Sequence, residues 1–303
     1  MRVLVTGGMG FVGSYLCEEL QRQEHKVIVI DDLSRANKNH HHFYDTFIKG
    51  DICDIQQYHH TIPEFDVIIH LATHPRSFSF EDIRLNTHTN VNGMIEILEL
   101  ARMRKKRIVY TSNSGIADPE TLPMTEGSKD HPTSPYDASK LVGEYYCDMY
   151  HERYGLSYII GRLGSVYGET QIVSEELKRF PVIATMTKNA ATNQPLWITG
   201  TGEQTRDFIH VMDIVYFLIT SMKSDVVGKF LVGTNKQTSL NEVHQTINKV
   251  LTQVIPVEYR EAIGQGIKLN QLDNSKAMNE LGWAPVISVE EGIRRCIAHW
   301  LRS

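Results

Sequence analysis

Residues 3–13 have the sequence VLVTGGMGFVG, a short apolar run that leads into a cluster of glycines. The pattern predicts a buried strand, a tight turn and the first turn of a helix. At Gly7, Gly10 and Gly13 the missing side chains let the backbone turn sharply and approach a pyrophosphate, which the positive end of the helix attracts. Glycine also serves turns that bind nothing. Because the cluster lies between the first strand and the first helix, we interpret it as the phosphate loop of a dinucleotide-binding fold.

The first half of the chain alternates short β-branched runs with longer helical patterns. Buried strands are expected at Arg2–Thr6, Lys26–Asp31, Phe47–Gly50, Val67–Leu71, Arg107–Ser112 and Ser157–Arg162. Helices are expected between them, among them Ser14–Gln23, Asn90–Arg104 and Tyr136–Tyr154. Strands that are apolar along their whole length are typical of a parallel sheet covered on both faces. The alternation therefore predicts an α/β fold with a doubly wound, Rossmann-type parallel sheet.

The regular alternation of strand and helix patterns ends after Gly164. Beyond it, helical patterns are shorter and loops are rich in Gly, Thr and Asn. Strands are expected at Pro195–Thr199, Lys229–Val232 and Val257–Arg260. We therefore expect residues 1–164 to form the dinucleotide-binding domain and residues 165–303 to form a smaller α+β substrate domain. Some of the later chain is expected to cross back to the first domain.

The composition is typical of a globular protein, with 41% hydrophobic and 22% charged residues over 303 positions. The net charge of −5 gives no broad attraction to nucleic acid or to an anionic membrane. The apolar run at the N-terminus is too short for a signal peptide, and no stretch approaches the roughly 18 apolar residues of a membrane span. The four cysteines are far apart, at Cys17, Cys53, Cys147 and Cys296. These features favour a cytoplasmic protein with reduced thiols.

Histidines gather at His40–His42 and again at His59 and His60. Adjacent histidines in a polar loop do not readily face one ion, and no cysteine or acidic partner stands at ligand spacing. We expect solvated loops here and no metal site.

The second strand ends in Asp31 and Asp32, and Asp31 lies about 20 residues beyond the phosphate loop. A carboxylate at this distance accepts hydrogen bonds from the hydroxyls of the adenosine ribose and repels a 2′-phosphate. The spacing therefore favours NAD over NADP. Arg35 follows closely and leaves the other cofactor open, because a guanidinium can bind a 2′-phosphate.

Tyr136 and Lys140 form a Tyr-x-x-x-Lys pair at the start of an expected helix, directly after Thr133-Ser134-Pro135. The i, i+4 spacing puts both side chains on one face of the helix. An ammonium beside a phenol favours the phenolate, so we expect Lys140 to lower the pKa of Tyr136 into a useful acid/base range. The pair is uninformative alone, but it is specific in a chain that also has the phosphate loop and Asp31.

With these motifs the chain resembles the extended short-chain dehydrogenases/reductases, and within them the NAD-dependent epimerase/dehydratase family. The resemblance runs almost from end to end. It is carried by residues 6–13, Asp31-Asp32-Leu33-Ser34, Gly50-Asp51-Ile52, His70-Leu71-Ala72, Asn90-Val91-Asn92-Gly93, Tyr136–Lys140, residues 162–168 and 202–213, and Leu281-Gly282-Trp283-Ala284-Pro285.

The resemblance implies roles for individual residues toward NAD. Backbone amides of Phe11 and Val12 would bind the pyrophosphate, Asp51 and Ile52 would flank adenine, and Lys140 would also bond the nicotinamide ribose. Further positions assigned to the cofactor are Asp32, Ser34, Arg35, Leu71, Ala72, Asn90 and Thr111.

The resemblance also implies a partner and a substrate. Arg206 and Arg260 would hold the diphosphate of a nucleotide-sugar, because a guanidinium stays charged and offers a planar fork of donors. Ser165 stands where many members have an Asn that contacts the nucleotide. The family implies a homodimer that pairs the helices Asn90–Arg104 and Tyr136–Tyr154.

The segment Tyr110–Asp118 departs from the family pattern. Members carry a Ser or Thr here that bonds the reacting hydroxyl or ketone of the substrate, and aligning Asp118 with the family's terminal glycine places Asn113 at that position. An amide can position the substrate but cannot relay a proton. A shift of one residue would put Ser112 or Ser114 there instead, and both alignments remain open.

The resemblance implies an NAD-dependent epimerase that acts on a nucleotide-diphosphate sugar, expected to be a UDP-sugar 4-epimerase with a transient 4-keto intermediate. Dehydratases carry an Asp-Glu pair after the Ser/Thr position and uronate decarboxylases a Glu, whereas this chain has Ser114-Gly115. Both of those activities therefore lose support. The alternatives are an NAD(P)H-dependent reductase of a nucleotide-linked ketosugar and a non-catalytic NAD-binding regulator. Tyr136 and Lys140 argue against the regulator.

Overall fold

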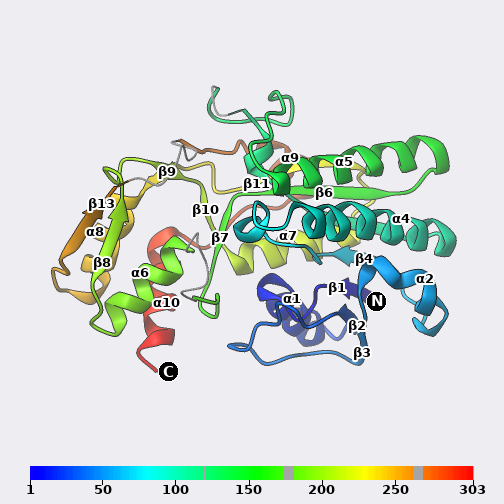
Figure 1. The fold of residues 1–303 in the computed structure, drawn as a ribbon, viewed down its shortest axis with the longest axis horizontal. Coiled ribbons are helices and arrows are strands. Elements are labelled where there is room, and N and C mark those ends of the chain that lie inside the picture. Colours follow the sequence, from blue (N-terminus) through cyan, green and yellow to red (C-terminus); the bar gives the residue numbers. More distant parts are fainter. Residues whose placement is uncertain (119–120, 174–180, 262–268, 303) are drawn as a thin grey trace.

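The computed structural model describes residues 1–118, 121–173, 181–261 and 269–302. Its main feature is a seven-stranded parallel sheet with the strand order β11-β6-β5-β4-β1-β2-β3 (Figure 1). These strands are β1 (Arg2–Thr6), β2 (Lys26–Asp31), β3 (Thr46–Lys49), β4 (Val67–His70), β5 (Arg107–Asn113), β6 (Tyr158–Leu163) and β11 (Gly228–Val232). The chain adds strands on one side of β1 and then, from β4 onward, on the other, so the doubly wound α/β fold is confirmed.

The remaining elements flank this sheet or form the C-terminal lobe. The longer helices are α1 (Phe11–Arg22), α4 (Gly93–Arg104), α5 (Pro135–Tyr154), α6 (Val182–Ala191), α7 (Val211–Lys223), α8 (Leu240–Leu251), α9 (Ser275–Leu281) and α10 (Val289–Trp300). Short helical segments are η1 (Ile52–Asp54), α2 (Ile55–Tyr58), η2 (His59–Thr61), η3 (Arg76–Phe78), α3 (Ile83–Thr87), the π-helical η4 (His88–Asn92) and η5 (Ser114–Ile116). Short strands are β7 (Ser165–Tyr167), β8 (Leu196–Thr199), β9 (Thr205–Arg206), β10 (Phe208–His210), β12 (Thr238–Ser239) and β13 (Val257–Arg260).

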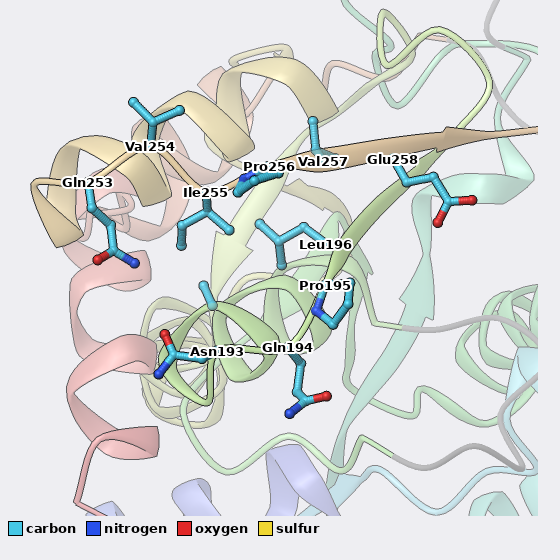
Figure 2. A pocket seen from close by; sticks show the side chains of 11 residues that line it. Asn193, Gln194, Pro195, Leu196, Gln253, Val254, Ile255, Pro256, Val257 and Glu258 are labelled. Carbon is cyan, nitrogen blue, oxygen red and sulfur yellow. The ribbon is translucent and has the colours of Figure 1, made fainter.

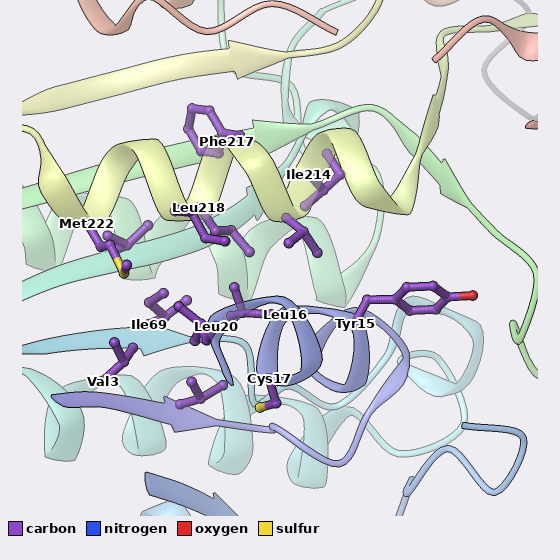
Figure 3. Close-up of a cluster of buried hydrophobic side chains, with 14 of the residues drawn as sticks. Val3, Tyr15, Leu16, Cys17, Leu20, Ile69, Ile214, Phe217, Leu218 and Met222 are labelled. Atoms are coloured by element: carbon purple, nitrogen blue, oxygen red, sulfur yellow. The ribbon is translucent and has the colours of Figure 1, made fainter. Parts of the chain in front are cut away.

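Side chains of the central strands alternate between two apolar layers, as the period of a strand requires. Val3 and Val5 of β1 face the layer that α1 and α7 cover, whereas Leu4 faces the layer beneath α4 and α5. Figure 3 shows the first layer, where Leu16 of α1 lies near Leu218 of α7. Both faces of the sheet are therefore buried, which explains why its strands are apolar at every position.

Strand β11 belongs to the large sheet, although it lies well after residue 164. The sequence pattern placed residues 229–232 with the strands of the smaller part, but β11 pairs in parallel with β6, with Lys229 opposite Ile160. Helix α7, which precedes it, packs against α1 on the large sheet. The chain thus leaves the sheet after β6, returns for α7 and β11, and leaves again.

The C-terminal lobe has its own apolar core, at the opposite end of the molecule from β3 in Figure 1. It packs α6, α8 and α10 together, with Ile183, Val243 and Ile293 fully buried. A small parallel sheet of β8 and β13 lies beside them. Among the described residues, none of the helices combines the length and the hydropathy needed to cross a bilayer.

The bounds of several elements differ slightly from expectation. The first two strands match the expected Arg2–Thr6 and Lys26–Asp31, whereas β3 begins and ends one residue earlier than Phe47–Gly50. The helix expected at Asn90–Arg104 is regular only from Gly93. Residues 88–92 before it are π-helical, a wider winding that recurs at functional sites.

Candidate active site

The strand order reverses between β1 and β4, and in open parallel sheets ligands bind at the carboxyl ends of the strands where this happens. The loops that leave these two ends are the glycine cluster after β1 and residues 71–78 after β4. Helix α5 starts near the same edge, because its contacts include η3 in the loop after β4 and η5 after β5. The candidate site is therefore at this edge.

The glycine loop has no room for side chains at two of its positions, so its main-chain atoms are uncovered there. Gly7 has a φ of +70°, and a Cβ atom there would lie 2.6 Å from the amide nitrogen of Ala72. A Cβ atom at Gly13 would lie 2.3 Å from the carbonyl oxygen of Gly7. Among the described residues no side chain caps the first turn of α1, which begins at Phe11 after Gly10. The residues present fit a pyrophosphate, because bare backbone meets the positive end of a helix.

Asp31 joins this loop to the end of β2. One of its carboxylate oxygens accepts from the Met9 amide at 3.0 Å and the other from the Leu33 amide at 2.8 Å. Burial raises the pKa of Asp31, and the two amide hydrogen bonds lower it in part. A carboxylate has about four lone-pair sites, so Asp31 retains acceptor capacity for ribose hydroxyls. We call residues 7–13, Asp31, Leu71 and Ala72 the cofactor cradle.

The other residues assigned to the adenosine side lie around the cradle. Asp32 accepts from the Ser34 amide at 2.8 Å and from its hydroxyl at 2.6 Å, so both stabilise the turn after β2. The Arg35 guanidinium lies 4.0 Å from the centre of the Phe78 ring. This contact joins the loops after β2 and β4, which flank the loop after β1 on either side.

Asp51 and Ile52 stand at the start of η1, after β3. The Asp51 carboxylate accepts from the Cys53 amide at 2.9 Å. Ile52 is buried against Gly93, where a Cβ atom would lie 2.5 Å from its Cδ1. The glycine thus allows α4 to approach the segment assigned to adenine.

Residues 71 and 72 belong to the wall of the cradle. Leu71 donates its amide to the Thr6 carbonyl at 3.0 Å, and the Ala72 amide lies 3.4 Å from the Thr6 hydroxyl. Thr111 is buried and donates its hydroxyl to the His70 carbonyl at 3.2 Å. Asn90 is also buried, and its side chain binds the loop after β4 rather than facing solvent.

Helix α5 carries Tyr136 and Lys140, the candidate catalytic pair. Ser134 caps it by accepting from the Asp137 amide at 3.1 Å, and Pro135 occupies its first turn. The Lys140 Nζ lies 5.8 Å from the centre of the Tyr136 ring, so the structure brings the two side chains together as predicted. Lys140 is 2% exposed and its Nζ also lies 4.7 Å from the centre of the Tyr110 ring.

The expected effect of Lys140 on Tyr136 is wrong for this structure. Burial raises the pKa of Tyr136 to about 12; the charge of Asp137 also raises it, and a hydrogen bond with the Thr73 side chain and the charge of Arg76 lower it in part. Burial lowers the pKa of Lys140 to about 7. Burial thus disfavours the charged form of both groups.

The segment after Tyr110 separates the three candidates for the Ser/Thr position. Asn113 ends β5, and its Oδ1 accepts from the Gly115 amide at 2.8 Å. The Ser112 hydroxyl instead donates to Glu144 at 2.6 Å. Glu144 is buried and paired with Arg162 at 2.7 Å, so Ser112 belongs to a buried ionic cluster and is not brought to the site. Ser114 is buried and begins η5.

The residues assigned to the nucleotide-sugar lie on three short strands of the later chain, β7, β9 and β13. Strand β7 pairs with β10, so Ser165 lies opposite Phe208, which follows Arg206 closely in the chain. Arg206 lies in β9, which pairs with β12. Arg260 lies in a separate sheet, where its guanidinium pairs with Glu258 at 2.9 Å and covers Trp197 at 5.1 Å.

Two functional candidates escaped the sequence analysis, Thr73 and Arg76. Both lie in the loop after β4, directly beyond the His70-Leu71-Ala72 motif, so their position at the site was available from the sequence. Nothing in a linear pattern indicates which way their side chains point. We call Tyr136, Lys140 and residues 73–76 the acid/base corner.

Two other clusters contain residue types that can bind a metal. The His40 imidazole binds Glu18 at 2.9 Å, and among the described residues the histidine run forms no group of metal ligands. Ligand atoms of Asp51, Cys53 and His88 do lie within 4.8 Å of one another. Burial, chiefly, raises the pKa of the Cys53 thiol to about 12.

A cavity of about 470 Å³ lies at the far end of the C-terminal lobe (Figure 2). Leu196, Ile255 and Pro256 are among the side chains that line it. It is formed between the segments that precede β8 and β13, and none of the residues assigned to cofactor or substrate lines it.

The phosphate loop, the acidic residue at the end of β2 and the Tyr136–Lys140 pair define a dinucleotide-dependent enzyme of the short-chain dehydrogenase/reductase type. The chain belongs to the NAD-dependent epimerase/dehydratase family, whose sequence model matches residues 3–233, and NAD is its cofactor. It is 34% identical over 308 residues to a putative UDP-glucose 4-epimerase of Methanocaldococcus jannaschii, covering 99% of this chain and 98% of the relative. It is 27% identical to UDP-glucuronic acid decarboxylase 1 of Danio rerio, covering 99% of this chain and 73% of the relative.

The fold is similar to that of solved epimerases. The UDP-glucose 4-epimerase of Thermotoga maritima, solved with UDP-glucose, superposes with a TM-score of 0.93 at 26% identity. The match covers 100% of this chain and 99% of that one.

Proposed function

We propose that this enzyme is a UDP-sugar 4-epimerase that works through a transient 4-keto sugar. The observation that carries the proposal is the Tyr136–Lys140 pair, held on one face of α5 at the edge of the sheet where the cofactor cradle opens. An epimerase needs one group that takes and returns a proton at the inverted carbon, together with a hydride carrier. The similarity to UDP-glucose 4-epimerases supports a UDP-sugar as the substrate.

In the proposed cycle Tyr136 accepts the proton of the 4-hydroxyl while the C4–H bond breaks, which leaves a ketone at C4. The sugar then presents its other face, the C4–H bond forms again with the opposite configuration, and Tyr136 returns the proton. Bound NAD would supply the acceptor and donor of the hydride. Nothing is consumed in the cycle, because the hydride returns to C4 and the proton returns to the oxygen on C4.

The cofactor cradle would hold the pyrophosphate and the adenosine ribose. Backbone amides of Phe11 and Val12 would donate to the pyrophosphate, and Asp31 would accept from the ribose hydroxyls. Asp51 and Ile52 would flank adenine. The remaining positions of the cofactor site would be Asp32, Ser34, Arg35, Leu71, Ala72, Asn90, Thr111 and Lys140.

The sugar nucleotide would lie between the acid/base corner and the C-terminal lobe. Arg206 and Ser165 would bind its nucleotide end, because β7, which carries Ser165, pairs with β10, and β10 follows β9 and Arg206 directly in the chain. Arg260, which is exposed, would add a second cation at the diphosphate. Asn113 and Ser114 would lie at the sugar.

The proposal includes a homodimer formed through α4 and α5. Val142, Tyr145 and Met149 are exposed on α5 at the i, i+3, i+7 spacing of a single helix face. Leu85 of α3 and Met103 of α4 are exposed large apolar residues as well. A row of apolar side chains on the surface is typical of a protein–protein interface. Light scattering should give twice the chain mass, and Tyr145→Glu should shift it to the monomer.

The proposed activity is tested by incubation with UDP-, GDP- and dTDP-sugars without added cofactor, with products resolved by NMR. We expect a mixture of C4 epimers from a UDP-sugar. A pentose product with release of CO₂ from UDP-glucuronate would identify a decarboxylase. Turnover that requires stoichiometric NADH or NADPH would identify a reductase, and either outcome would refute the proposal.

A further inference from the structure

Three side chains with metal-ligating atoms meet beside the segment assigned to adenine. Cys53 belongs to η1, which Asp51 precedes, and the π-helical η4 begins at His88. One ligand atom of each residue, a carboxylate oxygen, the thiol sulfur and an imidazole nitrogen, lies within 4.8 Å of the other two. Cys53 and His88 are 35 positions apart in the chain, so folding brings them together. We call the three residues the Asp-Cys-His triad.

The packing of η1 against the start of α4 produces this arrangement. The Cys53 thiol donates to the His88 carbonyl oxygen, 3.3 Å from the sulfur. A Cβ atom at Gly93 would lie 3.5 Å from the same sulfur and 2.5 Å from the buried Ile52. The glycine thus allows the two segments to approach each other. The positions of Cys53 and His88 therefore follow from the packing of the helical segments that carry them.

Polar neighbours orient two of the three ligands. Oδ1 of Asp51 accepts from the Cys53 amide at 2.9 Å, and a carboxylate has a second oxygen for another partner. The Asn92 side-chain amide lies 3.3 Å from Nδ1 of His88 and orients its ring. Outer partners of this kind hold the ligands of metal sites in place.

The surroundings of Cys53 are acidic. Asp54 follows it in the chain, and Glu96 lies in the first turn of α4, one turn beyond Gly93. Oε2 of Glu96 is buried, and within the described part of the chain it has no hydrogen-bond partner. Burial, and then the charges of Asp51 and of these two residues, raise the pKa of the Cys53 thiol. A bound cation reverses the effect of these charges, because a thiol that coordinates a metal loses its proton.

We propose that Asp51, Cys53 and His88 bind Zn²⁺. Carboxylate, thiolate and imidazole are all ligands of Zn²⁺, and three protein ligands leave the fourth tetrahedral position to water. Tetrahedral Zn²⁺ holds such ligand atoms about 3.3–3.6 Å apart, so binding requires side-chain shifts of about 1 Å. In the binding step the S–H bond of Cys53 breaks, its proton goes to the solvent, and a sulfur–zinc bond forms. Nothing is oxidised or reduced.

Bound Zn²⁺ would exclude NAD, because Asp51 would serve both. Asp51 is one of the residues that would flank adenine, and one of its oxygens already accepts from the Cys53 amide. A cation on the other oxygen would neutralise the carboxylate and occupy the place of adenine. Zn²⁺ should therefore inhibit the enzyme by competing with NAD. This competition rests on the proposed position of adenine.

The test is a titration of the full chain with Co²⁺, because a cobalt–thiolate bond absorbs in the near ultraviolet. The wild type should develop this absorbance with one equivalent of Co²⁺, and Zn²⁺ should remove it. Cys53→Ser should abolish the absorbance, and His88→Ala should weaken Zn²⁺ binding by about a hundredfold or more. His60→Ala is the matched control, because His60 is an exposed histidine near η1 that is not in the triad, and this variant should bind like the wild type.

NAD should compete with the metal in the same titration. At about ten times its own Kd, NAD should raise the apparent Kd of Co²⁺ about tenfold, as two ligands that exclude each other do. A Co²⁺ affinity that NAD leaves unchanged would overturn the proposal.

Equal Zn²⁺ affinity in the wild type and in both triad variants would also overturn it, because the metal would then be bound elsewhere, for example at His40–His42. His88 is exposed, so His88→Ala tests the site without disturbing the core. These measurements need no sugar nucleotide. Their failure is therefore distinct from failure of the epimerase assignment, in which the wild type converts no UDP-sugar.

Discussion

The cofactor cradle and the acid/base corner lie at the same edge of the sheet, but the first is formed mainly by main-chain atoms and the second by side chains. The cradle is made of backbone: glycines at positions 7 and 13 where a side chain would collide with main-chain atoms, and one carboxylate that binds two amides. The acid/base corner is made of side chains from α5 and from the loop after β4, which are joined by the ion pair between Arg76 and Asp137. Most residues of the cradle are close together in the chain, whereas the residues of the acid/base corner come from separate segments that folding brings together.

This difference predicts that the two regions can be damaged separately. A change of Tyr136 in the acid/base corner should alter rates and titrations with little effect on NAD affinity. Changes in the cradle should alter NAD affinity first, and the rate only because the cofactor is lost.

The largest effect is expected from Tyr136→Phe, which removes the acid and base but retains the ring. The rate should fall by roughly a hundredfold or more, the usual contribution of general acid–base catalysis. Calorimetry should give an NAD affinity within a few-fold of the wild type. A rate within a few-fold of the wild type would exclude Tyr136 as the acid/base group.

Gly13→Val should produce the opposite result. Its Cβ atom would lie 2.3 Å from the Gly7 carbonyl oxygen, a main-chain atom that cannot move aside without opening the loop. Overpacking of about 3 kcal/mol corresponds to a loss of NAD affinity of about a hundredfold. Gly127→Ala is the matched control, because the nearest atom to its Cβ would be 3.8 Å away. Normal NAD binding by Gly13→Val would show that the cradle is not built as described.

A third variant tests whether Arg206, in the later part of the chain, binds the nucleotide of the substrate. Arg206→Ala should weaken UDP binding by roughly ten- to a hundredfold, the value of a charge-assisted contact to phosphate, and leave NAD binding unchanged. Arg260→Ala should have a smaller effect, because this arginine is exposed and already paired with Glu258. Equal UDP affinity in Arg206→Ala and the wild type would contradict the assignment.

The smallest effect concerns cofactor selectivity. Asp31→Ala should narrow the preference for NAD over NADP, because the carboxylate that repels a 2′-phosphate is gone. The change is expected to be about tenfold in the ratio of affinities, since Asp31 also supports the loop through Met9. Calorimetry with both cofactors measures it, and tighter binding of NADP by the unmodified protein would reverse the prediction.

The sequence predicted those parts of the fold that depend on local patterns. β1 and β2 match residue by residue, because uniformly apolar β-branched runs are bounded by glycine and acidic residues. Helix α5 was recognised from its cap and its Tyr-x-x-x-Lys pair. Local patterns could not predict that β11 pairs with β6. The two strands are about 70 residues apart in the chain, and only tertiary packing selects that partner.

The candidate site likewise has one part that local sequence patterns predicted and one part that they did not. The spacing of glycines and of Asp31 located the cradle, since each position has a steric or electrostatic reason visible in the chain itself. The pKa of Lys140 depends on how deeply the fold buries it, and the sequence analysis therefore assigned it the wrong effect on Tyr136. Thr73 and Arg76 were missed because their role depends on the direction of a loop, and Ser112 was retained as a candidate because its partner Glu144 lies 32 residues away.

The return of β11 to the large sheet has a consequence for the order in which the protein can be made. Until residues 228–232 leave the ribosome, β6 is an open edge with unpaired backbone groups, which is a template for association with other chains. The α1 face is likewise bare until α7 has been synthesised. A nascent chain that ends near residue 164 therefore exposes an unpaired sheet edge and an uncovered apolar face. Such a chain is prone to aggregate until a chaperone binds it or synthesis of the remaining residues is complete.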